Sequence, residues 1–197
     1  KWFLISTPIF ILLGVAAYFA FAIKEFKGNG ILVHGAVLFT GLFPPIYAIV
    51  TDAPVYDGIR HFLFVYPSFV ILSAWAWHKL VSFSDKPAMR WGASGLLGVL
   101  MIPVLIWMYR SHPNQYVYFN ETVGGLKGAY TNYETDYWMN SAKEATLWLL
   151  ENDPKIQAGE TINVKTNCIK PVREYIKRYS DVTKVKPGYY AFRDRVD

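Results

Sequence analysis

The chain has 197 residues, of which 53% are hydrophobic and 18% are charged, with a formal net charge of +5 and a single cysteine, Cys168. The charges are spread unevenly: residues 1–109 hold seven of the 20 Lys and Arg residues and four of the 15 Asp and Glu residues. This distribution excludes one soluble globular domain and a disordered chain, and the lone cysteine excludes a disulfide framework or a thiolate metal cage.

Four apolar runs predict four transmembrane helices. The first covers about 2–23 and has no ionisable side chain between Trp2 and Ile23; its 22 residues span about 33 Å as a helix, enough to cross a hydrocarbon core of about 30 Å. The others cover about 31–50, 62–81 and 91–109. We therefore expect an α-helical polytopic membrane protein with residues 1–110 as its transmembrane region. A cleaved signal peptide, or core helices of a soluble protein, suits four successive runs of this length less well.

The short loops predict the orientation of these helices. The loops after the first and third runs carry Lys24, Lys27, Lys79, Lys86 and Arg90, whereas the loop between the second and third runs carries Arg60 alone. The positive-inside rule places the first two loops in the cytoplasm. The loop at 51–61 and the whole C-terminal tail are then outside, which for a bacterial inner membrane means periplasmic.

Prolines and glycines inside the runs predict a packed body of helices. Pro8, Pro44, Pro45, Pro67 and Pro103 each free a backbone group that neighbouring elements must satisfy. Gly92, Gly95 and Gly98 place small residues along the fourth run and are expected to permit close approach of another helix.

Residues 111–197 are predicted to form a small extracytoplasmic α/β domain that is incomplete. Ser141 and Glu144 have the spacing of a capping box before an apolar helix. Thr161–Thr166 alternates like a strand, Pro171 suits a first helical position, and Val182–Val185 and Tyr189–Phe192 are expected to be further strands. The order is that of a βαβ unit without a glycine-rich phosphate loop, so a nucleotide-binding Rossmann unit is not supported.

Two polar clusters are candidates for chemistry. Tyr56, Asp57, Arg60 and His61 lie in the second loop, where Arg60 suits a phosphate and His61 supplies a hydrogen bond or moves a proton; the simpler alternative is a snorkelling arginine paired with Asp57. The second cluster, suited to a sugar or to an interfacial tyrosine belt, comprises His112, Tyr116, Tyr118, Asn120, Asp136 and Trp138. His34, inside the second run, is either a packed, hydrogen-bonded histidine or part of a substrate or ion pathway through the membrane region. Asn120-Glu-Thr122 is a glycosylation sequon.

Three ordered motifs resemble one family. They are Tyr56-Asp-Gly-Ile-Arg-His-Phe-Leu-Phe64 with Pro67, then His112-Pro-Asn-Gln-Tyr-Val-Tyr-Phe-Asn120 with Gly124-Gly125, then Glu134-Thr-Asp-Tyr-Trp138. Over about residues 30–150 the chain is similar to the C-terminal part of bacterial family-39-type glycosyltransferases, members of the GT-C superfamily related to protein mannosyltransferases.

The resemblance implies an inverting membrane transferase that passes a sugar from a polyprenyl-phosphate carrier to an acceptor on the outer side. It implies carrier-phosphate binding by Arg60 and His61, with Tyr56 and Asp57 ordering their loop, and a sugar or acceptor side formed by the second cluster. It implies no cofactor, leaves the metal open, and places the family's catalytic acidic loop outside these residues. The partners are then membrane lipids, the lipid-linked sugar and the remainder of the enzyme or other membrane subunits, with no nucleic acid. The alternatives are a non-catalytic anchor or accessory subunit, and part of a transporter.

Overall fold

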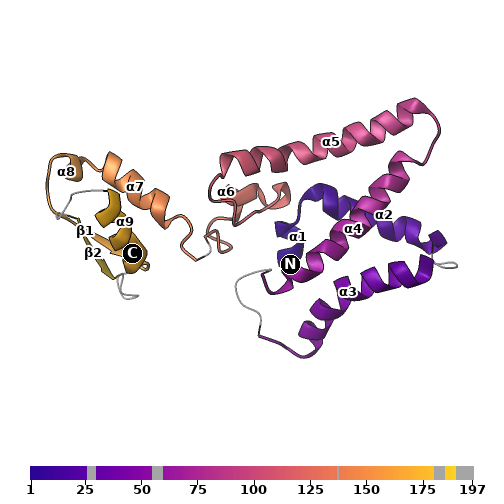
Figure 1. The fold of residues 1–197 in the computed structure, drawn as a ribbon, viewed down its shortest axis with the longest axis horizontal. Helices are drawn as coiled ribbons and strands as arrows, with labels where there is room; N and C mark the ends of the chain where they lie inside the picture. Colours follow the sequence, from indigo (N-terminus) through magenta and orange to yellow (C-terminus); the bar gives the residue numbers. More distant parts are fainter. Residues whose placement is uncertain (26–29, 55–59, 137, 180–184, 190–197) are drawn as a thin grey trace. The chain divides into compact units, whose positions relative to one another are not determined.

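The computed structural model describes residues 1–25, 30–54, 60–136, 138–179 and 185–189. The chain divides into two compact units, Lys1–Thr135 and Asp136–Asp197, and each is described by itself (Figure 1). The division falls after Thr135 and not at the expected boundary near residue 110. The reason is that the segment after the fourth apolar run packs back onto the start of the chain, where Phe119 and Ala129 share a core with Ile5.

The first unit is helical in the residues described. Its longer helices are α2 (Ile9–Glu25), α3 (Gly30–Val50), α4 (Tyr66–Val81) and α5 (Pro87–Arg110). Short elements complete it: α1 (Trp2–Ser6), the 3-10 helices η1 (Arg60–Val65) and η2 (Glu121–Val123), and α6 (Gly125–Ala129).

Helices α2 and α4 form the centre of this unit. Tyr18 and Ala22 of α2 pack with Leu72 and Ala76 of α4, and the indole N–H of Trp77 donates to the Phe10 carbonyl at 2.9 Å. Gly14 makes the close crossing possible, because a Cβ at this position would collide with the side chain and backbone of Ser73.

Two of the four expected spans form single helices long and apolar enough to cross a membrane, namely α3 and α5. The first expected span is interrupted at Thr7 and Pro8, so that its apolar helix is shorter, and the third begins as the 3-10 turn of η1 before the 16 residues of α4. The first interruption lies beside Pro8, which disfavours helical geometry in Thr7, the residue before it. Pro67 lies in the first turn of α4, where a proline is tolerated.

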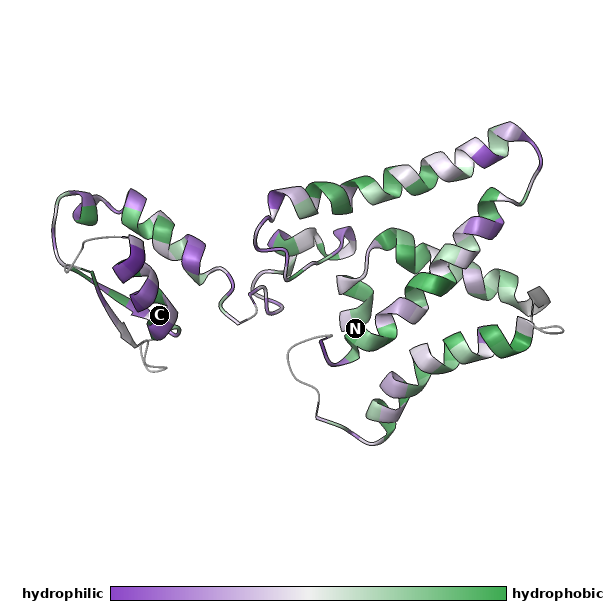
Figure 2. Cartoon of the chain, viewed as in Figure 1, coloured by the Kyte–Doolittle hydropathy of each residue, from purple (hydrophilic) through white to green (hydrophobic). Residues whose placement is uncertain are grey.

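The apolar surface of α3 and α5 is largely unburied (Figure 2). No residue of α5 is buried, and a Cβ added at Gly92, Gly95 or Gly98 would meet no atom of the described residues within 4 Å. The close helix approach expected at these glycines is therefore not made within the part of the chain that the structure describes.

The second unit is a βαβ unit, as the sequence predicts. Strands β1 (Ile162–Thr166) and β2 (Val185–Tyr189) pair in parallel, with Ile162 opposite Val185, and are connected through α9 (Ile169–Tyr179). Val172 and Ile176 of α9 pack against Val185, and α7 (Ala142–Asn152) contacts α9. The short α8 (Pro154–Gln157) is capped by Asp153, whose carboxylate accepts from the backbone of Lys155 and Ile156.

Local details of this unit differ from the expectation. The Ser141 side chain makes no capping bond to α7, because its hydroxyl donates instead to Asp136 at 2.7 Å; the predicted capping box is wrong. Helix α9 begins two residues before Pro171. The second strand covers Val185–Tyr189, between the two segments expected to be strands, whose remaining residues lie outside the described part.

Candidate functional site

The first candidate cluster is centred on Arg60 and His61 at the start of η1. The Arg60 Nε–H donates to His61 Nε2 at 3.3 Å, so this imidazole nitrogen is an acceptor and the proton of the neutral ring lies on Nδ1. Arg60 is half-buried and His61 is exposed. The pair therefore presents a guanidinium and a ring N–H at the surface, which is a donor arrangement suited to an anionic oxygen. Tyr56 and Asp57, expected to order this loop, lie outside the described residues.

The pair lies at the end of the unit where α1, the start of α4 and the 117–123 segment meet. Contacts between rings define this end: Phe3 lies 6.0 Å from Tyr66, and Trp2 lies 5.9 Å from Phe119. Because η1 leads directly into α4 and contacts both α3 and α4, Arg60 and His61 are held at the end where Tyr66 begins its helix.

His112 and Tyr116 are exposed residues of the segment after α5, with 65% of the Tyr116 surface accessible. Between them Gln115 donates from its side-chain amide to the Met108 carbonyl at 2.7 Å, which satisfies one of the free carbonyls at the end of α5. This contact fixes how the segment leaves the helix and leaves two aromatic rings accessible to a ligand.

Tyr118 points inward. Its ring lies edge-on to Trp107 of α5, with centroids 4.9 Å apart, and its hydroxyl is buried with no hydrogen-bond partner among the described residues. Burial, together with the nearby Glu121 carboxylate and Tyr66 phenol, raises the pKa of Tyr118 to about 12. A phenol with so high a pKa keeps its proton at neutral pH, so Tyr118 is a donor and not a base.

Asn120 is fully buried and has a structural role. Its backbone N–H donates to the Ile5 carbonyl at 2.8 Å, and its side-chain Nδ2 donates to the carbonyls of Leu4 and Thr7, both at 2.7 Å. Its Oδ1 accepts from the backbone N–H of Thr122 at 3.2 Å and from the hydroxyl of the same residue. Both amide protons are used, so in this fold Asn120 neither contacts a sugar nor accepts a glycan, although the sequence suggested both.

The reason for this arrangement is Pro8. Thr7, the residue before it, is extended with φ −99° and ψ 134°, so α1 ends at Ser6 and its last carbonyls have no partner within the helix. Asn120 supplies three donors to this break. The proline predicts that some neighbour must satisfy freed carbonyls, but nothing in the sequence points to a residue more than a hundred positions away.

The residues around Asn120 form a core that sequence reasoning missed as a unit. Phe119 is buried with Ile5 and Ala129, and Tyr133 stacks edge-on against Trp2 at 5.3 Å. The signal available was the density of aromatic residues at 116–133, for which the sequence left open a sugar-binding surface and an interfacial tyrosine belt. Phe119 and Tyr133 instead hold the segment on α1.

Asp136 and Trp138 belong to the second unit. The Asp136 carboxylate is exposed and accepts from Ser141, and Trp138 is exposed with a left-handed φ of 55°. His34 belongs to the first unit, where its Nδ1 lies 3.0 Å from the Tyr18 hydroxyl and its ring lies edge-on to Trp75. These contacts favour the packed histidine among the two alternatives for His34.

Within the described residues no group of three His, Cys, Asp or Glu side chains converges where a metal ion could bind. A hollow of about 670 Å³ lies in the second unit between α8 and the first strand, lined by residues including Asp153, Lys155 and Glu160. No family model, curated protein or solved structure matches this chain.

Proposed function

We propose that this chain is the membrane-embedded C-terminal part of a glycosyltransferase that takes its sugar from a polyprenyl-phosphate carrier, with Arg60 and His61 holding the carrier phosphate. The single observation that carries the proposal is the hydrogen bond from Arg60 Nε to His61 Nε2. It places a permanent cation and an imidazole next to each other at the surface of a helical unit, and a guanidinium suits the oxygens of a phosphate.

The surroundings of the pair support a lipid-linked ligand. Leu63 and Phe64 of η1 are both more than half exposed, one turn beyond the charged pair. An anionic head bound at Arg60 would thus have an apolar surface beside it for an isoprenoid chain. His112 and Tyr116 are exposed in the same unit and are our candidates for the sugar or acceptor side. Tyr118 contributes only if its hydroxyl becomes accessible.

The proposal includes four membrane crossings with Arg60, His61 and the C-terminal unit on the outer, periplasmic side of an inner membrane. Helices α3 and α5 cross as single helices. The α1–α2 pair and the η1–α4 pair cross as interrupted ones, and the carbonyls freed in the first are satisfied by Asn120. Non-helical backbone within a membrane protein is tolerated where other parts of the protein satisfy it.

The site is tested by carrier binding, since the acidic loop expected of the family lies outside these residues. In the purified chain, Arg60→Ala should weaken binding of undecaprenyl phosphate by about tenfold or more, because a charge-assisted phosphate contact is lost. Arg60→Lys should lie between Arg60→Ala and the wild type, and Lys127→Ala, at an exposed position of α6, is the matched control. Unchanged binding in Arg60→Ala removes the phosphate site.

The orientation is tested separately. In a Cys168→Ser background, a cysteine at Lys127 should react with a membrane-impermeant maleimide from the periplasmic side, and one at Lys86 should not. The opposite labelling would place Arg60 and His61 on the cytoplasmic side and contradict the proposal.

A non-catalytic anchor or accessory subunit is the second candidate. The observation that favours it is the structural use of Phe119 and Asn120, two residues of the motif that carries the resemblance. This candidate predicts that Arg60→Ala leaves carrier binding unchanged while the chain still binds other membrane subunits.

A further inference from the structure

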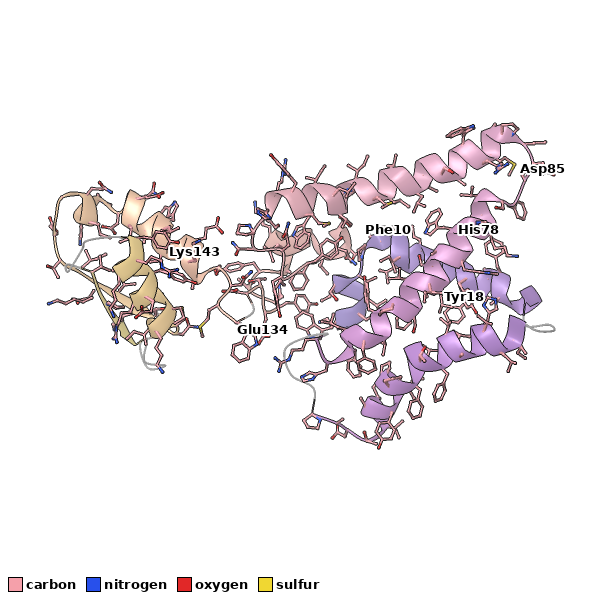
Figure 3. The ribbon with its side chains drawn as sticks, viewed as in Figure 1. Phe10, Tyr18, His78, Asp85, Glu134 and Lys143 are labelled. Atoms are coloured by element: carbon pink, nitrogen blue, oxygen red, sulfur yellow. The ribbon has the colours of Figure 1, made fainter. Side chains whose placement is uncertain are left out.

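The turn between α4 and α5 combines exposed aromatic residues with cations. Phe83 and Trp91 expose 70% and 78% of their surfaces, and Lys86 and Arg90 are exposed between them. Figure 3 labels Asp85 in this turn and His78 in the last turn of α4. The turn lies at the opposite end of α4 from Tyr66, and therefore away from Arg60 and His61.

Lys86 and Arg90 are both exposed, and Asp85 is the acidic residue of the same turn. Lys86 immediately precedes α5 as its N-cap, and the backbone N–H of Arg90, four residues later, donates to the Lys86 carbonyl at 3.3 Å. Within the described part of the chain neither makes an ion pair, and the first turn of α5 contains no acidic residue. Two exposed cations within five residues make this turn attractive to an anion.

The residues beside the cations indicate which kind of anion fits. From Trp91 onward α5 is apolar on its surface, with Leu96, Val99 and Ile102 exposed. Tryptophan with a neighbouring lysine or arginine, at the point where an apolar helix begins, is typical of the interface between headgroups and hydrocarbon. The anion is thus expected to carry acyl chains that lie along α5.

We propose that the 83–91 turn binds the headgroup phosphate of an anionic phospholipid through Lys86 and Arg90, with Phe83 and Trp91 inserted at the level of its glycerol backbone. The proposal rests on the membrane insertion included in the proposed function, but not on sugar transfer or on Arg60. With the orientation above, the lipid belongs to the cytoplasmic leaflet, where anionic lipids attract basic segments next to membrane helices.

The experiment measures binding of a phosphatidylglycerol with a fluorescent acyl chain to the full chain purified in a neutral detergent. Competitors are unlabelled phosphatidylglycerol, phosphatidylcholine and inorganic phosphate. We expect phosphatidylglycerol to compete about tenfold better than phosphatidylcholine. Lys86→Gln and Arg90→Gln should each weaken binding by about fivefold, and added salt should weaken wild-type binding.

The control variants are Lys127→Gln and Lys170→Gln, each of which removes one exposed cation elsewhere, as each test variant does in the turn. Lys86→Arg with Arg90→Lys keeps the charge and should keep the affinity. Circular dichroism establishes that each variant retains its helices.

Three results would overturn the lipid site: equal competition by the two lipids, an equal loss of affinity in the Lys127 and Lys170 controls, or displacement by inorganic phosphate as effective as by lipid. The test is separable from that of the proposed function. Arg60→Ala should leave phosphatidylglycerol binding unchanged, whereas failure of the chain to insert into phosphatidylcholine vesicles would contradict the membrane insertion itself.

Discussion

Removal of the Asn120 side chain is predicted to destabilise the first unit more than any nearby polar substitution. Asn120→Ala deprives the carbonyls of Leu4 and Thr7 of their 2.7 Å hydrogen bonds, while the Ile5 carbonyl keeps its bond to the backbone. Because Asn120 is fully buried, water cannot replace the lost donors without opening the core.

The magnitude follows from the number of acceptors left unpaired. A buried group without its partner costs about 1–3 kcal/mol, so two carbonyls together cost about 2–6 kcal/mol of the free energy of unfolding. Asn120→Asp keeps nearly the same shape but replaces the donating amide nitrogen by a carboxylate oxygen that faces the carbonyl oxygens of Leu4 and Thr7. We therefore expect at least the same loss of stability at neutral pH. Protonation of the new carboxylate restores one hydrogen-bond donor. The pKa of this carboxyl should be raised in the folded state, and stability should therefore recover as the pH falls toward its ordinary value of about 3.9.

Unfolding of the purified chain by sodium dodecyl sulfate, followed by circular dichroism, measures this loss. Asn132→Ala, at an exposed position of the same segment, is the control and should change stability by less than about 0.5 kcal/mol. Pro8→Ala allows Thr7 to become helical and should make the double variant less than additive by about 1 kcal/mol. If Asn120→Ala is no less stable than Asn132→Ala, our account of the α1–α2 break is refuted.

The other predictions concern packing, titration and the internal histidine. Gly14→Ala should destabilise by about 1–3 kcal/mol because its Cβ collides with Ser73, whereas Gly98→Ala, with open space around it, should be neutral or stabilising in the same unfolding assay; equal effects would contradict the close α2–α4 crossing. With its pKa of about 12, folded Tyr118 stays neutral while an unfolded tyrosine ionises near 10, so stability should fall as the pH rises between these values and fall less in Tyr118→Phe. Parallel pH curves for that variant and the wild type would show that Tyr118 is not buried. Tyr18→Phe, which removes the hydrogen bond to His34, should cost about 1 kcal/mol, and an unchanged midpoint would argue against this contact.

The pattern of hydrophobic residues predicted the apolar helices α3, α4 and α5 and the βαβ order of the second unit, but neither the break between α1 and α2 nor the short helices η2 and α6. Runs of apolar residues as long as α3 and α5 have few alternatives to helix, and the alternation at 162–166 followed by Val172 and Ile176 one turn apart specifies strand and then helix. The adjacency of Arg60 and His61 was also readable, because neighbours in sequence cannot be far apart in space.

The sequence by itself thus determined which long apolar segments are helical and which cations accompany them, since these depend on residues close together in the chain. It did not determine which prolines interrupt a helix: Pro44, Pro45 and Pro103 lie inside α3 and α5, whereas Thr7 before Pro8 is extended. The tertiary structure alone decided that Asn120 serves the break at Pro8, that Gly14 and not the glycines of α5 lies in a close crossing, and that Ser141 bonds Asp136 and not its own helix. The sequence does not distinguish an asparagine that is buried from one that is exposed. Which of them satisfies a freed carbonyl depends on how distant segments pack, and a pattern of neighbouring residues does not contain that information.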